Sequence, residues 1–179
     1  IRRQRQMCIR DSLKALNPAV EITTATERLT PDNALALLEK CDLAVDASDN
    51  YAARFALADA CAALRIPLVH GAVKGFIGQA TVFAPHEGTA CYRCLFPEET
   101  PMQEEDTASA AGILGAHAGI IGCIQALEAL KALAGIPSPL RGGLLSADTL
   151  RMRFTVIPLH PSPTCKCRNG GGGGAAMKN

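Results

Sequence analysis

The chain has 179 residues, of which 48% are hydrophobic and 20% are charged, so it can form one folded domain and disorder is not the expected state. Its formal net charge of +1 excludes the strongly basic composition of many nucleic-acid-binding proteins and gives no electrostatic reason to expect binding to a membrane surface. No long apolar run follows the basic N-terminus, so we predict no secretory signal and expect a cytoplasmic protein with no nucleic-acid or membrane partner.

The first half of the chain alternates between β-branched segments and helical segments with short links. Such alternation predicts a parallel α/β sheet. Thr30 and Pro31 suit the first turn of a helix, and Asn17-Pro18 is typical of a helix end. The expected elements are a helix end at 13–16, a strand at 20–24, a helix over 30–40, a strand at 43–46, a helix over 50–64 and a strand at 66–71.

The second half has a different pattern. The expected elements are a strand at 78–83, a mobile acidic loop at 97–107, a long apolar helix over 108–134, strands at 143–145 and 151–157, and a disordered glycine-rich tail at 169–179. The small residues of the long helix also suit a membrane span. We favour a buried helix of a water-soluble domain, because the apolar length is marginal for a span and the surrounding pattern is that of a soluble α/β protein.

Four of the eight cysteines fall into two close pairs. Cys91 and Cys94 form a C-x-x-C motif, and Cys165 and Cys167 form a second pair near the C-terminus. Paired thiols far apart in sequence predict a metal clip more than a disulfide framework. Zinc prefers four soft ligands in a tetrahedron, so we predict a structural Zn²⁺ on these four cysteines; the alternative is that Cys91 and Cys94 are plain buried thiols. The C-x-C spacing is tight, so one ligand could be strained.

A polar segment, Asp46 to Asn50, follows the short apolar strand predicted at 43–46. Open α/β sheets bind ligands at the carboxyl ends of their strands, where a carboxylate can hold Mg²⁺ that bridges nucleotide phosphates. The alternative is structural: Ser48 or Asp49 could cap the helix that begins near Asn50. The spacing alone does not separate these two interpretations.

Basic residues and histidines give weaker signals. Arg2, Arg3 and Arg5 could clamp phosphates, but arginines at a chain end are more often simply solvated. The four histidines show no ligand spacing, and only His70, at the end of a predicted strand, is expected near the Asp46 segment. No glycine-rich phosphate loop precedes Asp46, and the glycines of the tail are not framed by a strand and a helix.

In their order along the chain, these segments resemble the ThiF/MoeB/HesA family, relatives of the ubiquitin-activating enzymes. The resemblance covers residues from about Leu16 to Cys167. The matching segments are D-L-A-V-D-A-S-D-N at 42–50 with Arg54 after it, I-P-L-V-H-G-A-V at 66–73, G-Q-A-T-V-F at 78–83, C-Y-R-C-L-F-P at 91–97, G-I-L-G at 112–115, G-I-I-G-C-I-Q-A-L-E-A-L-K at 119–131 and L-L-S-A-D at 144–148.

The resemblance implies a fold and an activity. The fold is a Rossmann-like parallel sheet, incomplete at its N-terminus, with C-terminal antiparallel strands and a zinc clip, in a partial domain over 1–168. The activity is the ATP-dependent adenylylation of the C-terminal glycine of a small ubiquitin-like sulfur carrier that ends in Gly-Gly, for molybdopterin or thiamin biosynthesis. Further implied partners are a second copy in a homodimer of the full-length parent and a sulfurtransferase or cysteine desulfurase.

The resemblance also implies residue roles. Asp49 is expected to be the catalytic Mg²⁺-ATP aspartate, and Arg3 with Gln4 the remains of an R-Q motif that contacts phosphate. Asp46 and Asn50 are expected beside Asp49 in the nucleotide site. Cys91, Cys94, Cys165 and Cys167 are expected to be the zinc ligands. A carboxylate is a poor electrophile until its oxygen leaves as part of AMP, so such an enzyme mainly positions it and neutralises phosphate charge.

Three departures from the family pattern shape the expectation. The glycine-rich nucleotide loop would lie before Ile1, the family's lysine has no counterpart, and the thiol that some members carry before the G-I-L-G segment is absent at 107–109. We therefore expect that the chain alone, as a C-terminal fragment, does not adenylylate. The alternative function is a non-catalytic carrier-binding or dimerisation module. A dehydrogenase-type dinucleotide domain is disfavoured because its fingerprint is missing.

Overall fold

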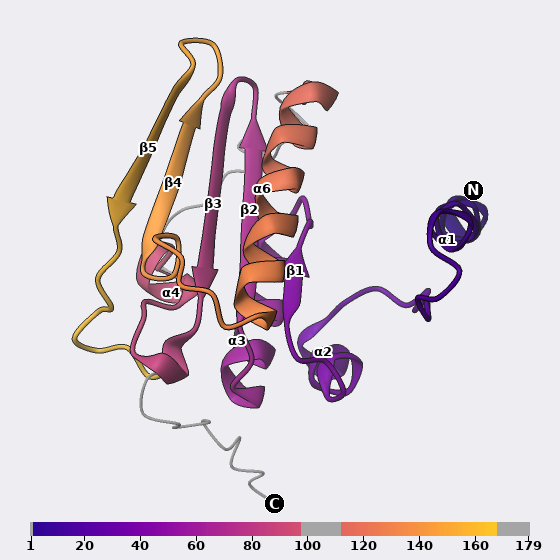
Figure 1. The fold of residues 1–179 in the computed structure, drawn as a ribbon. Coiled ribbons are helices and arrows are strands. Elements are labelled where there is room, and N and C mark those ends of the chain that lie inside the picture. The colour runs from indigo at the N-terminus through magenta and orange to yellow at the C-terminus, as the bar shows by residue number, and fades with distance from the viewer. Residues whose placement is uncertain (1, 98–111, 168–179) are drawn as a thin grey trace, which may run out of the picture.

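The structure, a computed structural model, describes residues 2–97 and 112–167, with side chains from residue 7 onward. Strands of the described residues form one sheet in the order β1-β2-β3-β4-β5 (Figure 1). The elements are α1 (Arg2–Leu16), α2 (Pro31–Leu38), β1 (Ala44–Asp46), α3 (Tyr51–Leu64), β2 (Leu68–Lys74), β3 (Ile77–Phe83), η1 (Pro85–Glu87), α4 (Tyr92–Leu95), α6 (Gly115–Leu133), β4 (Gly143–Asp148) and β5 (Arg153–Pro158).

The sheet is mixed, with one parallel pair followed by antiparallel strands toward the C-terminus, which agrees with the expected C-terminal antiparallel strands. Strands β1 and β2 are parallel and are joined through α3, as predicted, with Asp46 in register with His70. The pairs β2–β3, β3–β4 and β4–β5 are antiparallel. The reason for the first antiparallel pair is its short connection: Lys74 pairs with Ile77 across a two-residue turn in which Gly75 adopts a φ of +57°. A parallel partner would need a crossover of a dozen or more residues.

Two predicted elements differ from the observed ones. The strand predicted at 20–24 is wrong: these residues form no strand, and Val20 is exposed. Their β-branched alternation indicates a propensity, but a strand also needs a partner edge. The long helix begins at Gly115, because residues 112–114 are not helical and Ile113 forms an isolated bridge with Gly75.

The predicted acidic loop beyond Pro97, the predicted helix start at 108 and the predicted tail lie outside the described residues. The other elements agree with the prediction to within a few residues. In particular, α2 begins directly after Thr30, whose backbone N–H donates to Asn33 Oδ1 at 2.8 Å. The helix therefore starts where Thr30 and Pro31 indicated.

Alternating side chains of the sheet form two cores. On one face, Leu68 and Phe83 pack with Leu57 of α3 and Tyr92 of α4. On the other face, Val69, Ala80 and Val82 pack with Leu140 and Leu145, and partly buried residues of α6 join them. Because successive side chains of a strand point to opposite faces, His70 and Asp46 share the α3–α4 face with Leu68 and Ala44.

Helix α6 approaches the sheet closely at two glycines. A Cβ atom on Gly71 would lie 2.5 Å from Gln125 Oε1, and one on Gly78 would lie 2.6 Å from Ile121 Cδ1. Real Cβ atoms do not approach side chains so closely. The missing side chains of β2 and β3 therefore allow Gln125 of α6 to reach the backbone of the sheet.

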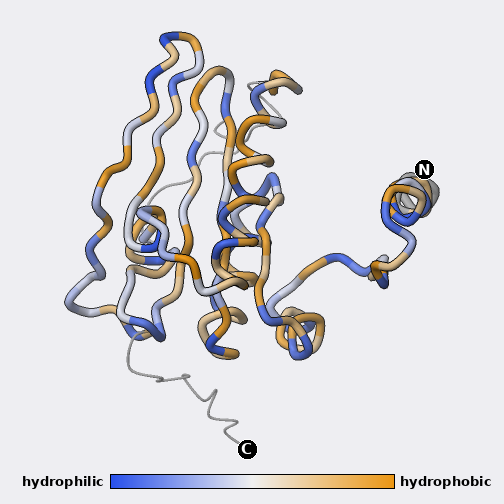
Figure 2. Tube along the Cα trace, viewed as in Figure 1, coloured by the Kyte–Doolittle hydropathy of each residue, from blue (hydrophilic) through white to orange (hydrophobic). Residues whose placement is uncertain are grey.

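The outer side of α6 is apolar and is not covered by the described residues. Figure 2 shows hydrophobic positions along this helix, and Ile120, Leu127, Leu130 and Leu133 are exposed. Within the described part of the chain, no helix combines the length and the apolar character that crossing a membrane requires. Helix α1 stands apart from the sheet at the end of an extended segment (Figure 1).

Candidate functional site

The carboxyl end of β1 carries a buried carboxylate, Asp46, which is 1% exposed. Its Oδ1 accepts hydrogen bonds from the backbone N–H of Ser48 at 2.9 Å and from Ser48 Oγ at 2.6 Å. Its Oδ2 lies 2.7 Å from Nδ1 of His70, which is fully buried on the neighbouring strand β2. Both oxygens of this carboxylate are thus engaged by the protein itself.

These contacts control the charge state of Asp46. Burial raises the pKa of a carboxyl group because it disfavours the anion. Here the hydrogen bonds from His70 and Ser48 outweigh burial, and the pKa of Asp46 lies below its usual value. The Asp46 side chain is therefore an anion, and Ser48 of the following turn donates two hydrogen bonds to it.

Two further residues secure the backbone of the same turn. Gln125 of α6 donates from Nε2 to the carbonyl oxygen of Asp46 at 2.7 Å and to that of Val69 at 3.3 Å. Arg54 of α3 donates from Nη2 to the carbonyl oxygen of Ser48 at 2.9 Å, and its Nε lies 3.8 Å from Asp46 Oδ2. The turn is therefore contacted from β2, α3 and α6 together.

Aromatic rings enclose the His70 imidazole. Tyr92 meets it edge-on with ring centroids 5.3 Å apart, and the Phe83 and Phe96 rings lie at 5.9 and 6.4 Å. Nε2 of His70 has no hydrogen-bond partner among the described residues. The imidazole therefore makes its polar contact through Nδ1, toward Asp46.

Asp49 differs from Asp46 in its exposure and in its hydrogen bonds. It is exposed, and its Oδ1 accepts a 3.3 Å hydrogen bond from Asn50 Nδ2. The N-cap of α3 is Asn50, whose Oδ1 accepts from the backbone N–H of Ala53 at 2.9 Å. The structural alternative, in which Ser48 or Asp49 caps this helix, is therefore wrong, because Asn50 occupies the cap position.

The predicted phosphate contacts of Arg3 and Gln4 stay a prediction. Both residues belong to helix α1, and the structure describes their backbone but not their side chains. The structure brings together Asp46, Asp49 and Asn50 in one turn at the sheet edge. Of these three, Asp49 is exposed, Asn50 is half-buried and Asp46 is buried.

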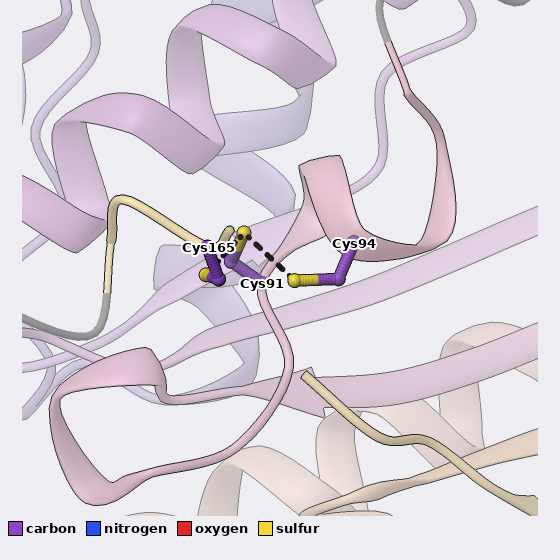
Figure 3. A group of neighbouring side chains, drawn as sticks. All are labelled: Cys91, Cys94 and Cys165. Carbon is purple, nitrogen blue, oxygen red and sulfur yellow. Dashed lines mark hydrogen bonds between the residues drawn. The ribbon is translucent and has the colours of Figure 1, made fainter. Parts of the chain in front are cut away.

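Three of the four paired cysteines, Cys91, Cys94 and Cys165, meet in space (Figure 3). The sulfur atoms of Cys91, Cys94 and Cys165 all lie within 4.8 Å of one another. Cys91 Sγ is 3.6 Å from Cys94 Sγ and 3.5 Å from Cys165 Sγ, distances too long for disulfide bonds. A tetrahedral zinc–thiolate site with Zn–S bonds of about 2.3 Å has sulfur separations of about 3.8 Å. The cluster therefore fits a tetrahedral metal ion.

The fourth predicted ligand, Cys167, is not one of the three cysteines whose sulfur atoms all lie within 4.8 Å of one another. It still interacts with the cluster, because a hydrogen bond with Cys91 lowers the pKa of its thiol. Burial raises the pKa of Cys165 to about 11. A bound cation would reverse such an effect, because thiols deprotonate when they coordinate a metal. The backbone N–H of Ser162 donates to Cys94 Sγ at 3.3 Å and ties the C-terminal segment to α4.

The sequence predicts only part of the contacts that complete the β1 turn. It places His70 near the Asp46 segment but assigns it no contact, and it gives no role to Gln125 of the apolar helix. The parallel register of β1 and β2, which pairs Asp46 with His70, is the signal that could have found the first. Gln125 had no such signal, because it reaches the turn only through the absent side chain of Gly71.

Comparison with known proteins agrees with the motif pattern. The model of the ThiF family matches residues 1–169. The chain is 42% identical to the adenylyltransferase and sulfurtransferase MOCS3-2 of Zea mays over 156 residues, which is 87% of this chain and 32% of that protein. It is also 42% identical to the sulfur carrier protein adenylyltransferase of Thermus thermophilus, over 86% of this chain and 58% of that protein.

Solved structures support the fold. The chain is similar to E. coli MccB in complex with ATP, with a TM-score of 0.68 at 14% identity over 89% of this chain and 48% of that one. It is similar to E. coli MccB without a stated ligand, with a TM-score of 0.70 at 13% identity over 91% and 49%. The chain therefore spans about a third to three-fifths of the proteins that it matches.

Proposed function

The chain belongs to the ThiF family, and we propose that the whole protein uses ATP to adenylylate the C-terminal glycine of a small ubiquitin-like sulfur-carrier protein. The observation that carries this proposal is the 42% identity with a sulfur carrier protein adenylyltransferase over 86% of this chain. Because the chain spans 58% of that relative, the activity is proposed for the whole protein and not for these residues alone.

In the proposed reaction, a carboxylate oxygen of the carrier's last glycine attacks the α-phosphorus of ATP. The bond between this phosphorus and the bridging oxygen breaks, and pyrophosphate leaves. The product is an acyl-adenylate. A persulfide sulfur of the donor displaces AMP to form an acyl disulfide, and a thiol then cleaves its S–S bond, releasing the thiocarboxylate and leaving a disulfide between this thiol and the donor. The pathway served by this sulfur is molybdopterin or thiamin biosynthesis.

Asp49 is the residue proposed to hold the Mg²⁺ that accompanies ATP. Its carboxylate is exposed at the carboxyl end of β1 and directly precedes the N-terminal end of α3. That end of a helix favours anions such as phosphates. Arg3 and Gln4 are proposed to contact phosphate, with Asn50 beside Asp49 at the same edge and Asp46 beneath them.

A structural zinc ion is proposed on Cys91, Cys94, Cys165 and Cys167. The support is the sulfur cluster, whose separations suit tetrahedral thiolate coordination. When bound, zinc would fix the α4 segment to the C-terminal segment.

The remaining proposals concern architecture and partners. In the whole protein, β1 and β2 would belong to a Rossmann-like parallel sheet, supported by the likeness to MccB. The exposed leucines of α6 support a contact with a second copy in a homodimer. A sulfurtransferase or cysteine desulfurase is proposed as sulfur source, supported by relatives whose name includes sulfurtransferase. The proposed location is cytoplasmic.

The test of the proposed function is Asp49→Ala in the intact protein. We expect ATP–pyrophosphate exchange in the presence of the carrier to fall on the order of a thousandfold, because a Mg²⁺ ligand stabilises the transition state by several kcal/mol. Thermal unfolding should be unchanged, since Asp49 is exposed. Asp42→Ala, at another exposed carboxylate just before β1, is the matched control and should exchange normally. Exchange within tenfold of wild type in Asp49→Ala would refute the assigned role.

A further inference from the structure

We propose that His70 is a positioning residue, which fixes Asp49 through its hydrogen bond to Asp46. This inference rests on the proposed function, because it assumes that Asp49 binds Mg²⁺-ATP. It goes further, since it assigns a role to a buried histidine that lies 24 positions from Asp46 in sequence.

The first step of the argument is that Asp49 cannot position itself. Its side chain is exposed, and among the described residues its one hydrogen bond is the 3.3 Å contact with the neighbouring Asn50. A ligand that must meet a metal within a few tenths of an ångström needs support from the residues around it. For Asp49 this support has to come from the backbone of the 46–50 turn.

The second step is that the Asp46 carboxylate organises that turn. Oδ1 accepts both the N–H and the hydroxyl of Ser48, which closes the turn immediately before Asp49. An anion that is 1% exposed is stable only if its remaining oxygen is also satisfied. His70 Nδ1 does this at 2.7 Å, whereas Arg54 Nε is no closer than 3.8 Å.

The third step is that His70 is itself rigid. It is 0% exposed, it sits on a central strand of the sheet, and the rings of Tyr92, Phe83 and Phe96 surround it. Its imidazole can therefore transmit the position of β2 to Asp46 with little freedom. The order of contacts is β2, His70, Asp46, Ser48 and then Asp49.

Two substitutions at position 70 separate positioning from packing. His70→Phe keeps an aromatic ring in the cluster but removes the donor to Asp46. His70→Asn removes the ring but can place an amide N–H near the position of Nδ1. A positioning role predicts that activity follows the donor, and a packing role predicts that activity follows the ring.

We expect ATP–pyrophosphate exchange by the intact protein to fall about tenfold to a hundredfold in His70→Phe, the usual effect of losing a residue that orients a ligand. The concentration of Mg²⁺ needed for half-maximal exchange should rise. His70→Asn should retain most of the exchange while its unfolding temperature falls, because the lost ring leaves a cavity. Wild-type exchange in His70→Phe, or equal losses in both variants, would overturn the proposal.

A second readout does not depend on activity. The backbone amide signals of Ser48, Asp49 and Asn50 in NMR spectra should shift in His70→Phe and remain near their wild-type positions in His70→Asn. If these shifts occur but the wild-type protein shows no exchange, the proposed function fails and the positioning stands. If exchange is lost in Asp49→Ala but the signals stay unchanged in His70→Phe, the positioning fails and the proposed function stands.

A variant outside the core covers the case in which His70→Phe does not fold. Ser48→Ala removes the 2.6 Å hydroxyl contact with Asp46 from a half-buried turn residue. We expect it to fold normally and to lower exchange several-fold. Unchanged exchange and unchanged amide signals in Ser48→Ala, beside an unfolded His70→Phe, would show that the pair serves only the fold.

Discussion

The turn after β1 and the cysteine cluster are neighbours in the fold, and they satisfy their polar atoms in different ways. In the turn, the carboxylate and carbonyl oxygens accept hydrogen bonds from His70, Gln125 and Arg54. In the cluster, the Cys91 sulfur faces other sulfurs at 3.5 and 3.6 Å. Thiols are weak donors and weak acceptors, so such contacts stabilise little. The acceptors of the turn are satisfied by donors of the protein itself, whereas the cluster gathers sulfur atoms that could hold a cation.

Tyr92 joins the two regions. It lies between Cys91 and Cys94 in sequence. The centre of its ring is 5.3 Å from that of the His70 ring and 5.1 Å from that of the Phe55 ring. The segment that carries the cluster thus also forms part of the wall around His70. The comparison teaches that a metal ion bound by the cysteines would secure the packing around the turn without touching the turn itself.

The largest effect is expected from breaking the cluster. Cys91→Ser should reduce the zinc content of the purified protein from about one ion per chain to nearly none. It should also strongly destabilise the fold, because structural zinc contributes on the order of 10 kcal/mol in small zinc-binding domains. Elemental analysis and thermal unfolding measure the two effects.

The control for this prediction is Cys123→Ser. Cys123 is exposed on α6, and it is not part of the cysteine group. It should keep both zinc and stability. A metal-free protein as stable as the metal-bound one would contradict the view that the cluster depends on a cation.

The cysteine cluster could be predicted from the sequence because its cysteines occur as close pairs, which are typical of metal ligands. Position 91 meets position 165 across 74 residues, yet each pair is visible locally. The turn was only half predicted. Asp46 and Asp49 stand at a strand end, and His70 is expected nearby, but its pairing with Asp46 follows only from the register of β1 and β2.

The fold shows the same division. The strands β4 and β5 and the helix α3 follow from local patterns, since turn residues and apolar runs mark them. The strand predicted at 20–24 failed because its alternation carries no information about a partner edge. The two-residue link at Gly75 makes β3 antiparallel to β2. The alternation of helices and strands along the chain does not indicate the length of this link.

A smaller effect is expected from disturbing the turn through α6. Gly71→Ala would place a Cβ atom 2.5 Å from Gln125 Oε1, so the amide of Gln125 would have to leave the carbonyl oxygens of Asp46 and Val69. We expect a loss of about 1–3 kcal/mol in the free energy of unfolding. Urea unfolding of the intact protein measures it.

Gly122→Ala is the matched control, because nothing lies within 4 Å of a Cβ atom on this exposed glycine of α6. It should stabilise the protein by about 0.5–1 kcal/mol, the usual gain of alanine over glycine in a helix. Equal stability of Gly71→Ala and wild type would show that the Gln125 contacts add nothing to the turn.

The smallest effect concerns the ion pair that links the cysteine segment to α3. Arg93 donates from Nε to Asp59 Oδ1 at 2.9 Å and from Nη2 to Asp59 Oδ2 at 2.6 Å, and its guanidinium lies 4.8 Å from the centre of the Phe55 ring. Both charged side chains are partly exposed, so solvent and salt weaken the attraction. If zinc holds the cysteine segment in place, the Arg93–Asp59 ion pair contributes only a small part of the stability of that segment.

Arg93→Lys keeps the charge but loses the two-pronged geometry, and we expect it to lower the free energy of unfolding by only about 0.5 kcal/mol. The difference should shrink further in roughly 1 M salt, where the Debye length is about 3 Å. Arg151→Lys provides the control, because Arg151 is more exposed than Arg93 and its pair with Asp148 lies in the β4–β5 hairpin, away from the cysteine segment. A loss above about 2 kcal/mol in the zinc-bound protein, well beyond what an exposed pair contributes, would reverse the comparison. It would mean that α3, and not the metal, secures the segment whose Tyr92 ring encloses His70.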